Sequence, residues 1–298
     1  MSRLVITLAG LAGLAGLATA AHAEPTAPPP PYAAPFQLRP TGVASVARAD
    51  TAFAVYDDEM GGGTTIASTW LASYRVNPTL APLVRIAVHH DTPTATGISN
   101  ALLGVTWAPK LPDPFRIGIL GAVTVPVGTG GGNAPNADRA AANRSAVFAR
   151  SAMDNALFAV NDLAVIGGAG VAYVDRGLTV QAEVTLFQLF RVRGDEVQPD
   201  TTKTNLTSGL FAGYFVVPQL SVGGELRYQR WLAAPKVVEM DTTGKTRDTV
   251  TAAIGLRGHV KLADKQWLRP GLSYGRGVDN PMRDRSYNIV QLDVIYAY

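Results

Sequence analysis

The chain of 298 residues contains no cysteine. This absence excludes a disulfide framework, thiolate catalysis and zinc sites built from cysteine. Charged residues are also scarce: they make up 16% of the chain, whereas hydrophobic residues make up 47%. Ordinary soluble domains carry about 25% charged residues. The formal net charge of +3 is too even for a protein that binds nucleic acid, so no nucleic-acid partner is expected.

The most apolar stretch of the sequence, residues 4–19, lies at the start of the chain. It follows Arg3 and precedes Ala21-His22-Ala23, which has the A-x-A pattern of a cleavage site. We predict a secretory signal peptide over residues 1–23, cleaved near Ala23; the alternative is an uncleaved N-terminal anchor. Beyond Ala23 no apolar run approaches the roughly 20 residues that a membrane-spanning helix needs.

From Thr41 onward, apolar residues recur at every second position, which is the period of a β-strand. In one such segment Val180, Ala182 and Val184 alternate with polar residues. The pattern predicts twelve strands, near residues 42–56, 64–76, 80–90, 98–108, 115–126, 163–174, 178–191, 204–217, 219–231, 248–261, 266–276 and 286–298. Short links such as 77–79 and 175–177 alternate with long ones such as 127–162 and 232–247.

This arrangement of strands is typical of a barrel that spans a membrane. Many predicted strands have ten to fourteen residues, whereas strands of globular proteins have about five or six and tilted membrane strands about 9–11. Tight turns at one end and long loops at the other are typical of outer-membrane barrels. Five aromatic residues near the tight-turn ends form a predicted interfacial girdle: Tyr74, Trp107, Tyr173, Tyr214 and Tyr298. The predicted fold is therefore all-β, an antiparallel transmembrane β-barrel of about twelve strands over residues 41–298. A soluble periplasmic β-sandwich is the alternative.

The last strand, with apolar residues at every second position and a terminal Tyr298, looks like the assembly signal of Gram-negative outer-membrane proteins. The chain thus resembles a porin-like Gram-negative outer-membrane β-barrel. The stretch Val123-Thr124-Val125-Pro126-Val127-Gly128-Thr129-Gly130 resembles the strand ending in Pro-Thr-Gly of the phenol-degradation-type transporter barrels, with Val127 and Gly128 inserted. The resemblance implies an outer-membrane location, contact with outer-membrane lipid and lipopolysaccharide, and recognition by the barrel-assembly machinery through the C-terminal strand. It leaves the oligomeric state open.

Residues 24–40, between the signal peptide and the first strand, are rich in proline. Such a segment favours an extended polyproline conformation. We expect a periplasmic tail here; the alternatives are a tether to the cell wall or a plug in the barrel mouth.

Charged residues at the inward positions of the strands are candidates for the lining of a pore. They are Arg85, Arg116, Glu183, Arg191, Glu225, Arg227, Arg257, Arg269 and Asp293. Rings of arginine favour anions in channels, whereas paired charges would only stiffen the barrel. The sequence leaves both interpretations open.

The longest link, residues 127–162, is called here the inserted loop. It becomes rich in alanine over residues 137–156, without Gly or Pro, and alanine is the best helix former. We therefore predict a helical insertion in the third outside loop that folds inward as a constriction and presents Arg139, Arg144 and Arg150 to solute. A helical lid or an unstructured surface loop is the alternative.

The predicted function is passive passage of small solutes through the barrel, without a catalytic residue, cofactor or metal ion. A closed structural barrel that acts through its outside loops is the alternative. A hydrolase at the barrel mouth is a third hypothesis, because Asp57, Asp58 and Glu59 lie at the outer end of one strand and His89-His90-Asp91 at that of another. His89 and His90 cannot easily chelate one ion together, because adjacent strand residues point to opposite faces.

Overall fold

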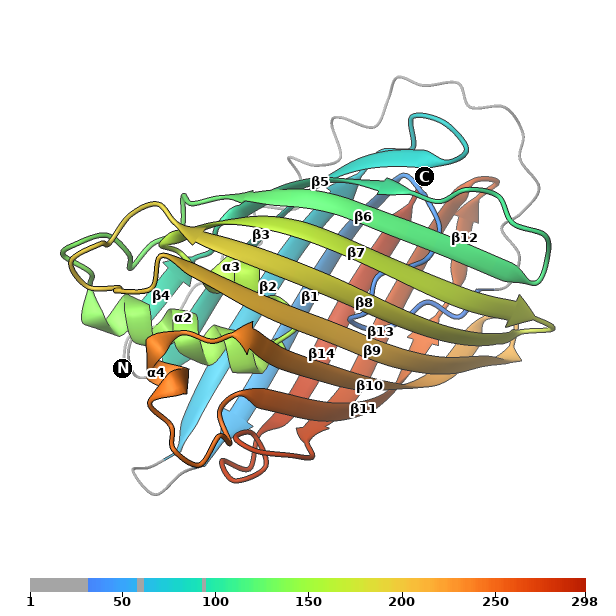
Figure 1. Ribbon diagram of the computed structural model, residues 1–298. Coiled ribbons are helices and arrows are strands. Elements are labelled where there is room, and N and C mark those ends of the chain that lie inside the picture. Colours follow the sequence, from blue (N-terminus) through green and yellow to red (C-terminus); the bar gives the residue numbers. More distant parts are fainter. Residues whose placement is uncertain (1–31, 58–61, 93–94) are drawn as a thin grey trace.

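The computed structural model describes residues 32–57, 62–92 and 95–298; the predicted signal peptide lies outside them. Within this part of the chain, one antiparallel sheet closes on itself into a barrel (Figure 1). The strands are β1 Val46–Tyr56, β2 Gly63–Ser73, β3 Leu80–Thr92, β4 Ala95–Ile98, β5 Ala101–Trp107, β6 Phe115–Val125, β7 Asp162–Asp175, β8 Leu178–Arg191, β9 Thr202–Val217, β10 Leu220–Ala233, β11 Asp248–Gly258, β12 Val260–Ala263, β13 Gln266–Gly277 and β14 Asn288–Ala297.

These segments make twelve wall strands, as predicted. The pairs β4–β5 and β11–β12 are each one strand with a short interruption, the first at Ser99 and Asn100 and the second at His259. Each wall strand pairs with its neighbour in sequence, and β1 pairs with β14 to close the barrel. A closed barrel leaves no unpaired sheet edge, so its backbone polar groups are satisfied within the wall.

Side chains alternate across the wall in the sense that a membrane requires. On β8 the apolar Val180, Val184 and Leu186 are exposed, whereas Thr179 and Thr185 are buried. A soluble sandwich would bury the apolar face instead. Four of the five predicted girdle aromatics, Tyr74, Trp107, Tyr173 and Tyr214, are exposed on the outer surface near the short turns, and Tyr298 is half-buried at the rim. The fold class predicted from the sequence is confirmed.

The three described helices lie at the end of the barrel with the long loops: α2 Ala137–Ala149, α3 Asn155–Phe158 and α4 Lys236–Glu239 (Figure 1). None of them is long and apolar enough to cross a membrane. The predicted continuous helix over 137–156 is wrong in one respect. The chain turns after α2 because Ser151 and Ala152 adopt left-handed backbone conformations, each with φ of 53°, which a helix cannot contain.

The expectation of a periplasmic tail over residues 24–40 does not hold for residues 32–40. Residues 32–41, called here the lumen segment, run inside the barrel, and Ala33, Phe36 and Leu38 are almost completely buried there. Phe36 and Leu38 pack against Phe211 of β9 and Met153 of the inserted loop. The barrel interior satisfies both the apolar side chains and the backbone of this segment, so it does not stay in water. Residues 24–31 lie outside the described part of the chain.

Candidate functional site: the barrel lumen

The inserted loop enters the barrel. Helix α2 contacts β1, β2, β3 and β4. The wall makes room for it with small inward-facing residues, because Ala52, Ala54, Ala67 and Ala87 have no exposed surface and share one apolar cluster with Ala146 and Ala149 of α2. Larger side chains at these wall positions would fill the space that the helix occupies.

The three arginines predicted to face solute behave differently from one another. Arg139 and Arg144 are exposed on α2, whereas Arg150 is completely buried in the lumen. Of the three, only Arg150 forms ion pairs with residues in the described part of the chain. The prediction assumed one helical face for all three residues, whereas Arg150 lies beyond the end of the helix.

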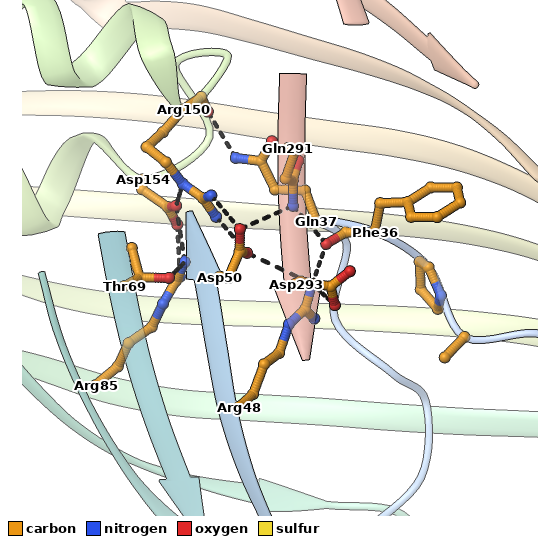
Figure 2. Close-up of polar contacts among 12 residues, drawn as sticks. Phe36, Gln37, Arg48, Asp50, Thr69, Arg85, Arg150, Asp154, Gln291 and Asp293 are labelled. Atoms are coloured by element: carbon orange, nitrogen blue, oxygen red, sulfur yellow. Dashed lines mark hydrogen bonds and ion pairs between the residues drawn. The ribbon is translucent and has the colours of Figure 1, made fainter. Parts of the chain in front are cut away.

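Arg150 is the centre of an ion-pair network across the lumen (Figure 2). Its Nη1 and Nη2 donate to the two carboxylate oxygens of Asp50 on β1 at 2.7 and 2.9 Å, and its Nε donates to Asp154 at 3.0 Å. Asp154 also accepts two hydrogen bonds from Arg85 of β3, at 2.6 and 2.9 Å. Both carboxylates were missed in the sequence, although Asp50 occupies an inward position of the β1 pattern and Asp154 lies four residues after Arg150.

The network sets the protonation of Asp154. Burial alone would raise the pKa of its carboxyl group, but the positive charges of Arg85 and Arg150 outweigh burial and hold the pKa well below its usual range. Asp154 is therefore charged at neutral pH, and the inserted loop is tied to two strands of the wall by charge.

Several residues predicted to line a pore bind the lumen segment instead. Glu225 accepts hydrogen bonds from the backbone N–H groups of Phe36 and Gln37, and Glu183 accepts one from the N–H of Arg39 at 2.8 Å. Arg257 donates to the carbonyl oxygens of Ala34 and Pro35, at 3.1 and 3.0 Å. These inward charges thus hold a piece of chain rather than a passing solute.

The other predicted lining residues occupy different levels of the barrel. Arg227 pairs with Glu225 and donates to Ser151 of the inserted loop at 3.1 Å. Asp293 pairs with Arg257 at 3.0 Å and with Arg48 at 3.2 Å. Arg191 lies at the outer rim, where it donates to the carbonyl oxygen of Gln198. Arg116 and Arg269 face a cavity and are described next.

A cavity of about 730 Å³ occupies the half of the lumen toward the short turns. It reaches from rim residues such as Tyr74 and Tyr298 to Met153 and Asp154 beneath the inserted loop. Arg116 and Arg269 line it, and neither forms an ion pair with a residue in the described part of the chain. Burial raises the pKa of Tyr32, at one side of the cavity, to about 12, so its hydroxyl stays neutral.

The groups proposed for a hydrolase do not form one exposed cluster. His89 is buried against Phe158, with 5.3 Å between the ring centres, and His90 lies on the opposite face with its Nδ1 2.9 Å from Thr96 Oγ1. Asp91 is buried and accepts hydrogen bonds from Thr65 and Ser145. Asp57 is exposed, and Asp58 and Glu59 lie outside the described residues. No group of three or more His, Asp or Glu in the described ranges is placed to hold a metal ion.

The chain is similar to known proteins in its three-dimensional structure but matches none of the compared sequences. No protein-family model and no curated protein sequence matches the chain. Among solved structures, an outer-membrane channel from Pseudomonas putida F1 matches with a TM-score of 0.55 and 11% identity, covering 88% of this chain and 98% of that one. The NanC porin matches with a TM-score of 0.50 and 10% identity, covering 83% and 98%. The chain therefore has the fold of an outer-membrane β-barrel.

Proposed function

We propose that the protein is a passive channel for small solutes in the outer membrane of a Gram-negative bacterium, reached after cleavage near Ala23. The observation that carries this proposal is the cavity of about 730 Å³ inside a closed wall of twelve strands. Eight-stranded barrels fill their interior with side chains and sixteen-stranded ones leave a water channel, so twelve strands give an intermediate bore. The similar outer-membrane channel and porin support the same function.

Two parts of the chain narrow this bore. The inserted loop occupies the lumen toward the long loops, and the lumen segment occupies its middle. They meet where Gln37 Nε2 donates to the carbonyl oxygen of Arg150 at 2.6 Å and where Met153 packs against Phe36 and Leu38. We infer that the positions of these two parts set the conductance.

A closed barrel that acts through its outside loops is the second candidate. The specific observation in its favour is that four buried lumen arginines or lysines have close carboxylate partners: Arg150 with Asp50, Lys203 with Asp162, Arg227 with Glu225, and Arg257 with Asp293. Paired buried charges stiffen a core and do not attract solute. In this candidate the two obstructions stay in place permanently.

Single-channel conductance in a planar bilayer distinguishes the two candidates. The proteins to compare are refolded residues 24–298, a variant without residues 137–156, and a control in which the exposed turn 241–246 is replaced by Gly-Ser residues. A channel gives steady conductance that rises with the 137–156 deletion and stays unchanged in the control. Silence of all three proteins, with circular dichroism and heat-modifiable migration showing folded barrels, would overturn the channel proposal.

Contact with outer-membrane lipid and lipopolysaccharide, and recognition of the strand that ends in Tyr298 by the assembly machinery, are part of the same proposal. They are supported by the apolar outer surface and by the closure of the barrel through β1 and β14. Reconstitution of the wild type and of a variant without Tyr298 with the assembly machinery would test whether that machinery recognises the C-terminal strand.

A further inference from the structure

The cavity is lined on one side by apolar side chains that point inward. Leu83, Leu102, Leu120, Ile166 and Phe187, from β3, β5, β6, β7 and β8, all face it. They belong to one apolar cluster, and Ile166 and Phe187 lie directly opposite each other in the strand register. These five neighbouring residues form what we call the apolar patch.

An apolar patch inside the lumen is unusual, because inward positions of membrane barrels are normally polar. The inserted loop covers part of it, since Leu157 and Phe158 belong to the same cluster. The remainder lines the cavity but exposes little surface: Leu102, Leu120, Ile166 and Phe187 are 3–8% exposed, and Leu83 is half-buried. Apolar surface in contact with water is stabilised by about 25 cal/mol per Å² when something covers it. A solute with an apolar body would gain this free energy by resting there.

The same cavity presents positive charge without a carboxylate partner. Arg116 lies on β6, four residues nearer the short turns than Leu120 and on the same inward face, and its guanidinium carbon is 5.6 Å from the centre of the Tyr32 ring. Arg269 lines the cavity from β13, beside the Trp267 ring at 5.9 Å, and its buried Nε has no hydrogen-bond partner. In contrast, Arg85 at the inner end of the cavity is paired with Asp154.

The spacing of these groups sets the shape of the solute. Four residues of a strand span about 13 Å, and the long arginine stem covers part of that distance. Thr41 of the lumen segment lies over Gly118, between Arg116 and Leu120, so a solute does not lie flat along β6. Within the cavity, a molecule one ring or a few methylenes long could place an anionic end at Arg116 and its body against the apolar patch. The cavity volume lies within the range of roughly 300–1,000 Å³ found for small-molecule sites.

We propose that the lumen contains a binding site for small amphipathic organic anions, in which Arg116 takes the carboxylate and the apolar patch takes the hydrocarbon body. Arg269 adds positive charge from the opposite side of the cavity. This inference rests on the proposed channel function and names its class of solute: organic acids that combine a carboxylate with an aromatic or aliphatic body.

The test measures binding of a defined probe, 3-phenylpropionate, to the refolded protein in detergent by equilibrium dialysis and calorimetry. Two further probes separate the contribution of the carboxylate to binding from that of the apolar body: 3-phenylpropan-1-ol has the body without the charge, and propionate has the charge without the ring. We expect both to bind at least about tenfold more weakly than 3-phenylpropionate, because each loses one of the two interactions. Equal binding of propionate would overturn the role of the apolar patch.

Variants locate the site. Arg116→Gln is expected to weaken binding about tenfold and Arg116→Lys less, because lysine keeps the charge but not the bidentate geometry. Leu120→Thr should weaken 3-phenylpropionate but not propionate. Arg144→Gln, on the exposed side of α2, is the matched control and should bind like the wild type. Unchanged affinity in Arg116→Gln would overturn the proposal.

Conductance measurements keep this inference separate from the channel itself. If the protein conducts and the binding site exists, 3-phenylpropionate reduces the single-channel current of the wild type and has less effect on that of Arg116→Gln. Binding in a protein that never conducts would overturn the channel function and leave the site standing. A conducting protein that binds none of the probes would overturn the site alone.

Discussion

Replacing Arg150 by methionine should release the inserted loop from the lumen. The Arg150 side chain has no exposed surface and pairs with Asp50 and Asp154, whose side chains are 3% and 10% exposed. Arg150→Met keeps much of the hydrocarbon stem but leaves two buried carboxylates without this cation. Movement of the inserted loop, which lets water reach both groups, relieves that cost.

The expected size of the effect follows from the geometry. Removing one partner of a buried ion pair costs about 3–5 kcal/mol. Arg85 still pairs with Asp154, and Arg48 lies 3.5 Å from Asp50, so we expect the lower end of this range. About 1.4 kcal/mol changes an equilibrium constant tenfold, so the equilibrium between docked and released loop should shift roughly a hundredfold toward release.

Two assays report the release. Single-channel conductance should rise in Arg150→Met, and chymotrypsin should cut at the half-buried Phe148 faster than in the wild type. Arg144→Met makes the same substitution at an exposed site and should change neither result. The double variant Asp50→Leu with Arg150→Met should restore much of the protection, because an apolar pair replaces the ionic one. If Arg150→Met matched the wild type in both assays, the ion pairs would not be what holds the loop.

Three further predictions address the same lumen. Because the folded-state pKa of Asp154 is depressed, its stabilisation is complete above the unfolded pKa of about 4 and is lost as pH falls through the lower folded value. Protection of Phe148, measured with chymotrypsin near neutral pH and with pepsin at pH 5 and below, should therefore persist from pH 8 to 5 and decline only in stronger acid; a loss near neutrality would contradict this. Gly118→Val should displace the lumen segment, since a Cβ at Gly118 would lie 3.1 Å from Thr41 Cα. The chain has no cysteine, so Ala34→Cys introduces a single one, which should react with maleimide faster in the Gly118→Val variant than in the protein with Gly118. An unchanged rate would disprove the contact between residue 118 and Thr41. Asn100→Ala removes side-chain hydrogen bonds to Ala159, Asp162 and Gly128 and should weaken the docking of α3 by about 2 kcal/mol. Hydrogen exchange at residues 155–160 should accelerate roughly thirtyfold if opening is local, and unaltered exchange would refute it.

The amino-acid sequence by itself determined the wall of this protein. Strand period, strand length and the alternation of short and long links are local properties, because a strand places successive side chains on opposite faces whatever surrounds it. The predicted strand at 178–191 coincides with β8, and inward residues such as Glu183 and Asp293 were identified from period alone. Errors at other strands are confined to a few residues at their ends, as at β1, which begins at Val46 rather than at 42.

Only the tertiary structure decided what fills the lumen. Residues 32–40 have the composition of a tail. Hydrogen bonds from their backbone to Glu225 and Arg257, about two hundred positions away in sequence, hold them inside the barrel. The helix of the inserted loop ends where Arg150 meets Asp50, one hundred residues away. Local propensity has no information about such partners, because they come together only when the barrel closes.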